Sequence, residues 1–243
     1  MTTQRIALVT GANKGLGFET SRQLGRQGVH VLMGCRNAAR GRAAAKMLRD
    51  EGLEVEFVHL DVTNRDHIAQ AVKTIKKRFS RLDILVNNAG GSFGEDRAPN
   101  STATITPRDL RRTFDVNFFG LVELTQALLP LIRKSDAGRI VNVSSIMGSL
   151  AYQSRGGGAS YMPFAYDSSK TAVNSFTIHL AAALGNTSIK VNSVHPGWVR
   201  TDIGGPNAPL SPAEGAMTAV RLATLGPAGP TGGFFHGEGS VAW

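Results

Sequence analysis

Short apolar runs alternate with longer stretches of helical periodicity along nearly the whole chain. The apolar runs are rich in β-branched residues and are bounded by turn-forming residues, which is typical of buried strands. They predict strands at residues 6–10, 29–33, 55–60, 84–87, 139–143 and 190–194, with a weaker seventh strand at 233–235. The stretches between them predict helices at residues 16–27, 38–51, 65–79, 107–134, 163–185 and 211–225.

Four of the predicted helices begin at residues that commonly start helices. Asn37 and Asn64 stand at N-cap positions, and Thr106 and Ser211 are each followed by proline. Strand, helix and strand repeated in this order indicate parallel pairing through right-handed crossovers. The sequence therefore predicts an α/β fold, a single doubly wound Rossmann-type domain over residues 1–243. We expect a mostly parallel seven-stranded sheet with helices on both faces.

Composition supports a globular, cytoplasmic protein. With 42% hydrophobic and 19% charged residues, the chain has enough apolar material for a core, which excludes a disordered chain. Cys35 is the only cysteine and the six histidines are scattered, so neither a disulfide nor a metal site is expected. The N-terminus lacks a signal-peptide pattern, and we expect no other segment to approach the ~20 apolar residues that span a bilayer. We therefore expect no membrane partner.

The basic charge of the chain does not indicate a nucleic-acid site. Lys and Arg number 27 against 18 Asp and Glu, a formal net charge of +9. The basic residues are dispersed and aromatics make up 7% of the chain, so neither a basic stripe nor a stacking platform is present. A dispersed surplus is typical of a solvated surface, and nucleic-acid binding is not expected.

The turn after the first predicted strand contains three glycines, in Thr10-Gly11-Ala12-Asn13-Lys14-Gly15-Leu16-Gly17. Glycines there let the backbone approach a pyrophosphate at the helix N-terminus, where free N–H groups and the helix dipole favour an anion. Such a trio also occurs in ordinary strand-to-helix turns, but its position after the first strand favours a dinucleotide site. The candidate cofactor residues in this turn are Gly11, Asn13, Lys14, Gly15, Leu16 and Gly17.

Residues after the second predicted strand favour NADP over NAD. An NAD site has an acidic residue about 20 positions past the glycines, to bind the ribose 2′-hydroxyl. Here no Asp or Glu occurs between Glu19 and Asp50, and Arg36 and Arg40 stand in that region instead. With Lys14, these cations suit the 2′-phosphate of NADP(H). For Arg40, a solvated helix face is an equally acceptable interpretation.

Tyr166 and Lys170 are spaced four residues apart, which places them on one face of a predicted helix. A tyrosine near pKa 10 is a poor acid or base at neutral pH unless a nearby cation stabilises its phenolate. This spacing is common on exposed helices, so it indicates a catalytic site only when other motifs accompany it.

Those neighbours complete an ordered set of motifs. They are Asn87-Asn88-Ala89-Gly90, Asn117, Ser144-Ser145 and Pro196-Gly197, each near the end of a predicted strand or within a predicted helix. With the glycine turn and Tyr166-x-x-x-Lys170, the chain from Thr10 to about Thr201 resembles the short-chain dehydrogenase/reductase family. Within that family it looks most like NADPH-dependent carbonyl reductases.

The resemblance implies a role for each matching residue. Ser145 would hold the carbonyl oxygen and Tyr166 would be the general acid. Lys170 would lower the pKa of that tyrosine and bind the nicotinamide ribose, and Asn117 would hold a water in the proton relay. The remaining implied cofactor residues are Asp61, Val62, Asn88, Ala89, Gly90, Pro196, Gly197, Val199 and Thr201, together with Tyr166 and Lys170.

Several residues beside this predicted site have two interpretations. Phe93, Ile146, Met147 and Trp198 are candidates for the substrate-pocket wall, with ordinary core packing as the alternative. His195 fits a packed histidine better than a catalytic base, because Tyr166 already has that role. Cys35 fits a small core residue better than a reactive thiol.

The chain departs from the family pattern in one interval. Ser145 and Tyr166 are 21 positions apart, longer than is common in the family and shorter than in animal carbonyl reductases. The extra residues lie in the Gly-rich segment 148–160, one of two segments, with 91–101, that we interpret as ligand loops. This insertion affects the pocket shape and the family's dimer face. A homodimer, a homotetramer and a monomer all remain open.

The leading function is an NADPH-dependent reduction of aldehydes or ketones, with a small carbonyl compound as substrate. Two alternatives remain. One is reduction of a 3-oxoacyl group on an acyl carrier protein, since a basic enzyme attracts an acidic partner. The other is a regulator that binds NADP without chemistry, against which the complete set of catalytic residues argues.

Overall fold

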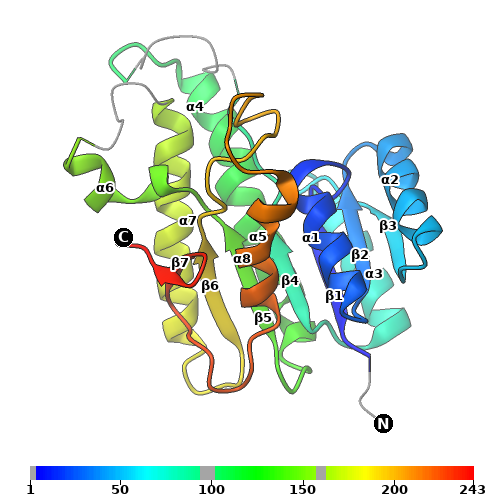
Figure 1. Ribbon diagram of the computed structural model, residues 1–243. Helices are drawn as coiled ribbons and strands as arrows, with labels where there is room; N and C mark the ends of the chain where they lie inside the picture. The colour runs from blue at the N-terminus through cyan, green and yellow to red at the C-terminus, as the bar shows by residue number, and fades with distance from the viewer. Residues whose placement is uncertain (1–3, 94–101, 157–162) are drawn as a thin grey trace.

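Eight strands pair into one sheet in the computed structural model, which describes residues 4–93, 102–156 and 163–243 (Figure 1). The strands are β1 (Ile6–Thr10), β2 (His30–Cys35), β3 (Val55–His59), β4 (Ile84–Asn87), β5 (Arg139–Val143), β6 (Lys190–Val194), β7 (Phe234–His236) and β8 (Gly239–Ser240). Their order across the sheet is β3-β2-β1-β4-β5-β6-β7-β8, with β1 to β7 parallel and β8 antiparallel to β7. The order reverses between β1 and β4, and doubly wound sheets bind ligands at such a switch point.

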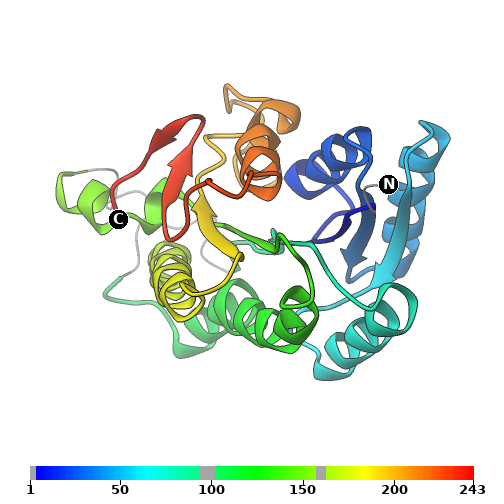
Figure 2. The same cartoon turned by 90° about the horizontal axis from the view of Figure 1, so that it is seen from below.

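The helices cover both faces of this sheet. They are α1 (Gly15–Arg26), α2 (Ala38–Asp50), α3 (Arg65–Phe79), α4 (Pro107–Phe114), α5 (Gly120–Ile132), α6 (Leu150–Ser154), α7 (Phe164–Ala183) and α8 (Pro212–Ala223). Viewed along the strands, α1 and α8 lie on one side of the sheet and α3, α5 and α7 on the other (Figure 2). The predicted start signals are confirmed, because Asn37, Asn64, Thr106 and Ser211 each accept a hydrogen bond from a backbone N–H in the first turn.

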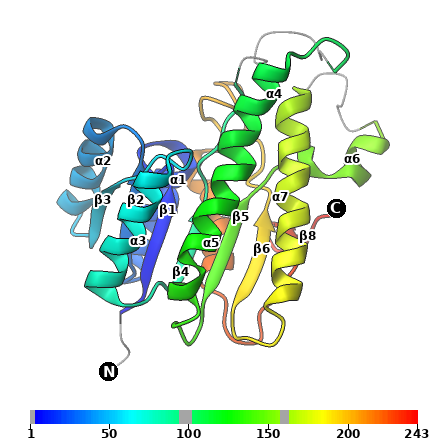
Figure 3. The ribbon, with the colours of Figure 1, turned by 180° about the vertical axis from the view of Figure 1, so that it is seen from behind.

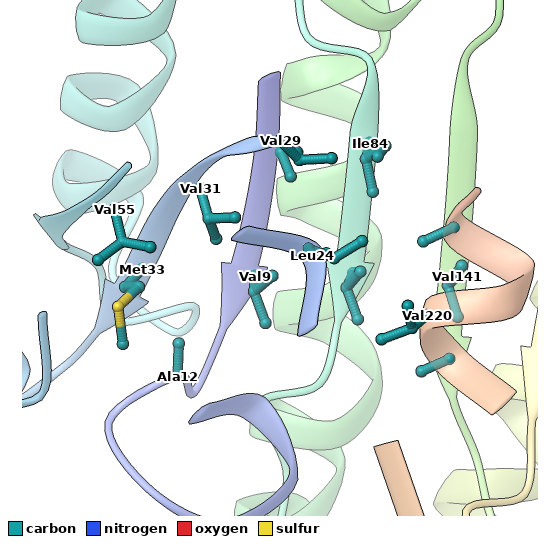
Figure 4. Close-up of a cluster of buried hydrophobic side chains, with 14 of the residues drawn as sticks. Val9, Ala12, Leu24, Val29, Val31, Met33, Val55, Ile84, Val141 and Val220 are labelled. Atoms are coloured by element: carbon teal, nitrogen blue, oxygen red, sulfur yellow. The ribbon is translucent and has the colours of Figure 1, made fainter. Parts of the chain in front are cut away.

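Alternating residues of the strands divide the core into two clusters. Val9 of β1 packs with Leu24 of α1 and Val220 of α8 in one cluster (Figure 4), whereas its neighbour Leu8 packs with Leu128 of α5 in the other. All five of these side chains are buried. Replacing Leu24 or Leu128 by alanine is expected to lower the free energy of unfolding by ~2–5 kcal/mol.

The predicted helix 107–134 differs most from the observed structure. It is a rod of α4, a five-residue π-helical segment at Asp115–Phe119, and α5, lying beside α7 (Figure 3). The backbone N–H of Gly120 bonds to the carbonyl of Asp115, the i to i−5 pattern of a π turn. The apolar period continues through the rod, which is why the interruption was not predicted.

The same rod bears on our expectation about membrane-spanning segments. Pro107–Ile132 has 26 residues, and a window of 18 residues within it has a mean hydropathy of 1.3, so by length and composition it is the one described helix that meets the criterion for crossing a bilayer. Its apolar side chains Leu124, Leu128 and Leu131 are buried against the sheet. A helix that is buried in a protein core can meet the same criterion of length and composition.

Other differences from the prediction are short elements. A 3₁₀ turn at Ile146–Gly148, helix α6 and strand β8 were not predicted, and β8 makes the sheet eight-stranded rather than seven-stranded. The expected ligand loops 91–101 and 148–160 are described only in part, because 94–101 and 157–160 lie outside the described residues.

Candidate active site

The glycine turn after β1 forms a cradle that side chains would fill. Gly11 and Gly15 adopt φ of +64° and +55°, in the left-handed region that favours glycine. A Cβ at Gly17 would lie 2.5 Å from the Nδ2 of Asn88 and 2.5 Å from the carbonyl oxygen of Gly11. Helix α1 begins after Lys14 without a side-chain cap, so its first N–H groups are available to an anion.

Hydrogen bonds from Thr10 join this turn to the loop after β4. The Oγ1 of Thr10 accepts from the backbone N–H groups of Asn88 and Ala89, each at 2.9 Å. In return the Asn88 side chain donates to the carbonyl of Thr10 at 2.8 Å. The two loops at the switch point therefore form one unit. Sequence reasoning identified Thr10 only as part of a motif and missed this role, because a pairing between positions 78 apart leaves no local signal.

Cations stand where the second strand ends. Arg36 directly follows β2, its side chain is 71% exposed, and its Nε lies 4.0 Å from a carboxylate oxygen of Asp61. Arg40 lies in the first turn of α2 and is also exposed. Val62, beside Asp61, packs so closely on α5 that a Cβ at Gly120 would lie 2.6 Å from its carbonyl oxygen.

Lys14 makes a contact that the sequence did not predict. Its ammonium forms an exposed ion pair with Asp202, which belongs to the segment after β6. A Cβ at Gly15 would lie 3.3 Å from the Cγ2 of Thr201, so the two segments also touch beneath the ion pair. Val199 in the same segment is buried, and Gly197 adopts φ +87° next to Pro196. The segment 196–202 thus lies directly against the glycine turn.

These features fit a dinucleotide that carries an additional phosphate. The uncapped helix start and the glycine cradle suit a pyrophosphate, and exposed Arg36 and Arg40 suit a 2′-phosphate. Asp61 stands beside Arg36, where it accepts from the backbone and hydroxyl of Thr63.

Helix α7 brings Tyr166 and Lys170 to Ser145. Lys170 is 4% exposed, its Nζ donates to the carbonyl of Val143 at 2.8 Å, and it lies 5.6 Å from the centre of the Tyr166 ring. Burial lowers the pKa of Lys170 to about 8. Burial also raises the pKa of Tyr166 to about 12, against the opposing effect of a hydrogen bond with Ser145.

Asn117 sits in the π segment and ties the rod to the loop after β4. Its amide donates to the carbonyl of Gly91 and to the Oγ of Ser169, and its Oδ1 accepts from the N–H of Gly91, all at 2.9 Å. Both amide hydrogens are therefore used within the protein. A Cβ at Gly90 would lie 3.1 Å from this Oδ1 and 3.3 Å from the Lys170 Nζ, so a side chain there would crowd both groups.

The four candidate pocket residues have different surroundings in the structure. Ile146 lines a cavity of about 300 Å³, whose other lining residues are Ser149, Ala151, Tyr152, Arg155, Gly156, Val241 and Ala242. Met147 is buried, whereas the Trp198 ring is exposed and its Nε1 donates to the carbonyl of Gly204. The guanidinium of Arg112 lies over the Phe93 ring, 5.5 Å from its centre.

A dinucleotide cradle beside a tyrosine, a buried lysine and a serine is the arrangement of an NAD(P)-dependent oxidoreductase. The model of the short chain dehydrogenase family matches residues 5–209, and the chain belongs to this family. The chain is 36% identical to carbonyl reductase [NADPH] 1 of Bos taurus, with 98% of each chain covered.

Solved structures agree with this assignment. The crystal structure of NADPH-bound carbonyl reductase from chicken fatty liver superposes with a TM-score of 0.86 at 27% identity, covering 99% of each chain. Salutaridine reductase from Papaver somniferum superposes with a TM-score of 0.82 at 30% identity, covering 96% of this chain and 99% of that chain.

Proposed function

We propose that the protein is an NADPH-dependent reductase of aldehydes and ketones. The observation that carries this proposal is the burial of Lys170 beside Tyr166 and Ser145, at the end of a glycine cradle that accepts a dinucleotide. The similarity to carbonyl reductases over nearly the whole chain supports the same function. A single buried cysteine that carries no disulfide suits the cytoplasm, where we propose that the enzyme acts.

In this proposal Ser145 and Tyr166 act on the carbonyl oxygen. The Ser145 Oγ accepts from the N–H of Met147 at 3.2 Å, which leaves its hydroxyl hydrogen to donate to the substrate. Tyr166 protonates the oxygen as negative charge grows on it, and the serine hydrogen bond strengthens at the same time. Bound NADPH supplies the hydride.

Lys170 and Asn117 assist the proton transfer from Tyr166. The charged ammonium of Lys170 stabilises the phenolate that Tyr166 becomes when it gives up its proton. Asn117 holds the loop after β4 against α7 through Gly91 and Ser169, and in this proposal it also positions the water of the proton relay. Lys14, Arg36 and Arg40 bind the 2′-phosphate, and the remaining cradle residues bind the rest of the dinucleotide.

Tyr166→Phe tests this function. We expect turnover to fall by at least ~100-fold on any ketone that the parent reduces, since one general acid contributes about that much. NADPH binding, measured by fluorescence titration, should stay nearly unchanged, because the ring remains in place. Wild-type turnover in this variant would show that another group protonates the substrate.

A substrate comparison separates this function from the alternatives. NADPH oxidation is followed on quinones, aromatic ketones and aliphatic aldehydes, and on a 3-oxoacyl group attached to an acyl carrier protein. We expect higher kcat/KM on the free carbonyl compounds. Exclusive turnover of the carrier-bound group would favour the acyl reductase, and tight NADPH binding without any turnover would favour a regulator.

A further inference from the structure

His195 lies at the junction between β6 and the turn that contains Pro196 and Gly197. Its Nδ1 accepts two backbone hydrogen bonds, from the N–H of Ile146 at 3.1 Å and from the N–H of Gly197 at 3.4 Å. One imidazole nitrogen can accept two donors only if it carries no proton, so the ring is the neutral tautomer protonated at Nε2.

The surroundings of this ring keep it neutral and fixed. Burial, together with the neighbouring His236, lowers the pKa of His195 to about 4. The His236 ring lies 4.9 Å from the His195 ring, and its Nδ1 bonds to the His195 carbonyl at 3.0 Å. His195 therefore remains an acceptor throughout the neutral pH range, with its own backbone anchored to β7.

One of the two donors belongs to the loop that carries Ser145. Ser145 has extended backbone angles and precedes the 3₁₀ turn at Ile146–Gly148, so the N–H of Ile146 lies at the start of that turn. Such an N–H has no partner within its own helix and needs an external acceptor. Nδ1 of His195 is that acceptor, and this bond fixes the position of the peptide group that joins Ser145 to Ile146.

The other donor belongs to the turn that lies against the glycine cradle. Gly197 has φ +87°, and a Cβ there would lie 2.4 Å from the Cδ1 of Leu210, so the turn favours glycine. The bond from its N–H to His195 holds the turn in place. A single nitrogen thus joins the substrate-facing loop to the cofactor-facing segment 196–202.

We propose that His195 is a positioning residue that holds Ser145 in register with the cofactor segment, through hydrogen bonds that its Nδ1 accepts from Ile146 and Gly197. The proposal rests on the proposed function, because it assumes that Ser145 binds the carbonyl oxygen. The imidazole itself touches no reacting atom, and Tyr166 remains the general acid.

Three substitutions at one position test this role. His195→Asn places an amide oxygen near the position of Nδ1, His195→Gln places its amide near Nε2, and His195→Phe keeps the ring without an acceptor. We expect kcat to fall ~10- to 100-fold in the Gln and Phe variants, because small misplacements at a reacting centre cost about that much. The Asn variant should keep most of the wild-type kcat, and KM should change little in all three.

A second measurement does not depend on turnover. Amide hydrogen exchange should accelerate at Ile146 and Gly197 in His195→Gln, and return to the wild-type rate in His195→Asn. If the Phe variant does not fold, the Asn and Gln pair still decides the question. Equal kcat and equal exchange in the Asn and Gln variants would overturn the proposal.

The outcome for His195 is separable from the outcome for the proposed function. If the wild-type protein reduces no carbonyl compound, the proposed function fails, while the exchange rates still report whether Nδ1 holds the two N–H groups. If the wild type is active and His195→Gln matches it in kcat, the positioning role fails and the proposed function stands.

Discussion

At the scale of single residues, burial shifts two catalytic groups in opposite directions. It raises the pKa of Tyr166 to about 12, so the phenol keeps its proton for delivery, and it lowers the pKa of Lys170 to about 8. Both shifts follow from one cause, because a low-dielectric site disfavours the charged form of each group. The lysine is therefore the group that titrates near physiological pH.

This shift predicts the pH dependence of reduction. Lys170 carries its charge below its pKa and loses it above, so kcat/KM should fall as pH rises through about 8. Lys170→Arg keeps a charge at all accessible pH values, and in whatever activity remains the fall should move to higher pH. The same fall near pH 8 in Lys170→Arg would assign it to another group.

We predict that cofactor selectivity depends on Arg36. Replacing it by Asp removes a charge-assisted bond to the 2′-phosphate and sets a second carboxylate beside Asp61. The ratio of kcat/KM for NADPH over NADH should fall by at least ~100-fold, since each 1.4 kcal/mol is a factor of ten. An unchanged ratio in Arg36→Asp would mean that the 2′-phosphate binds elsewhere.

Asp202 competes with the cofactor for Lys14. In Asp202→Asn the ammonium of Lys14 is released, so NADPH should bind ~2- to 5-fold more tightly, the range expected for one exposed ion pair. NADH binding should hardly change, because it has no 2′-phosphate. The gain should vanish in the double variant with Lys14→Ala, and a gain that persists there would contradict this explanation.

Residues predicted from motifs are those whose chemistry is visible in one stretch of sequence. The glycine turn, Tyr166 and Lys170 belong to this group. Asp202 and Thr10 were missed as partners, because Lys14 and Asp202 are 188 positions apart and only the fold brings them together.

At the scale of elements, hydrophobic period predicted every long strand and helix of the described chain. The bounds of β1, β4, β5 and β6 agree with the prediction to the residue. The period could not reveal the π segment, since it changes hydrogen-bond partners and not residue types. Nor could it reveal α6 or β8, whose five and two residues are too short to show any period.

The amino edge of the sheet holds a buried carboxylate that links three elements. Asp83, just before β4, accepts from the N–H of Ile6 at 2.8 Å and from the hydroxyl of Ser135 at 2.6 Å, and it pairs with Arg81. Asp83→Asn replaces one carboxylate oxygen by an NH₂ group. This group is a donor, and it would face the N–H of Ile6 or the hydroxyl of Ser135, which are donors as well. We expect a loss of ~1.5–3 kcal/mol in unfolding free energy.

Urea unfolding at neutral pH measures this loss, with Arg81→Ala as the control. Arg81 is more exposed than Asp83, so removing it should cost less than 1 kcal/mol, roughly the value of an exposed ion pair. A larger loss in Arg81→Ala than in Asp83→Asn would mean that the ion pair, and not the backbone and hydroxyl bonds, holds this edge together.

At the scale of the whole molecule, the site lies at the carboxyl ends of the central strands of the sheet. The loops after β1, β4, β5 and β6 supply the cradle, Gly90, Ser145 and His195 in turn, while helix α7 supplies Tyr166 and Lys170. The family motifs therefore predict most of this site. Helix α6, which forms part of the wall of the cavity beside Ile146, was not predicted, because its five residues are too few to show a helical period.

The π segment of the rod also has a consequence for changes in chain length. A π turn holds one residue more than the α-helical path between the same ends, and each residue of an α-helix turns by about 100°. Deleting one residue from 115–119 would restore a regular helix and rotate α4 against α5, carrying Asn117 away from Gly91. Insertions and deletions among relatives should therefore accumulate in loops and be purged from residues 107–132.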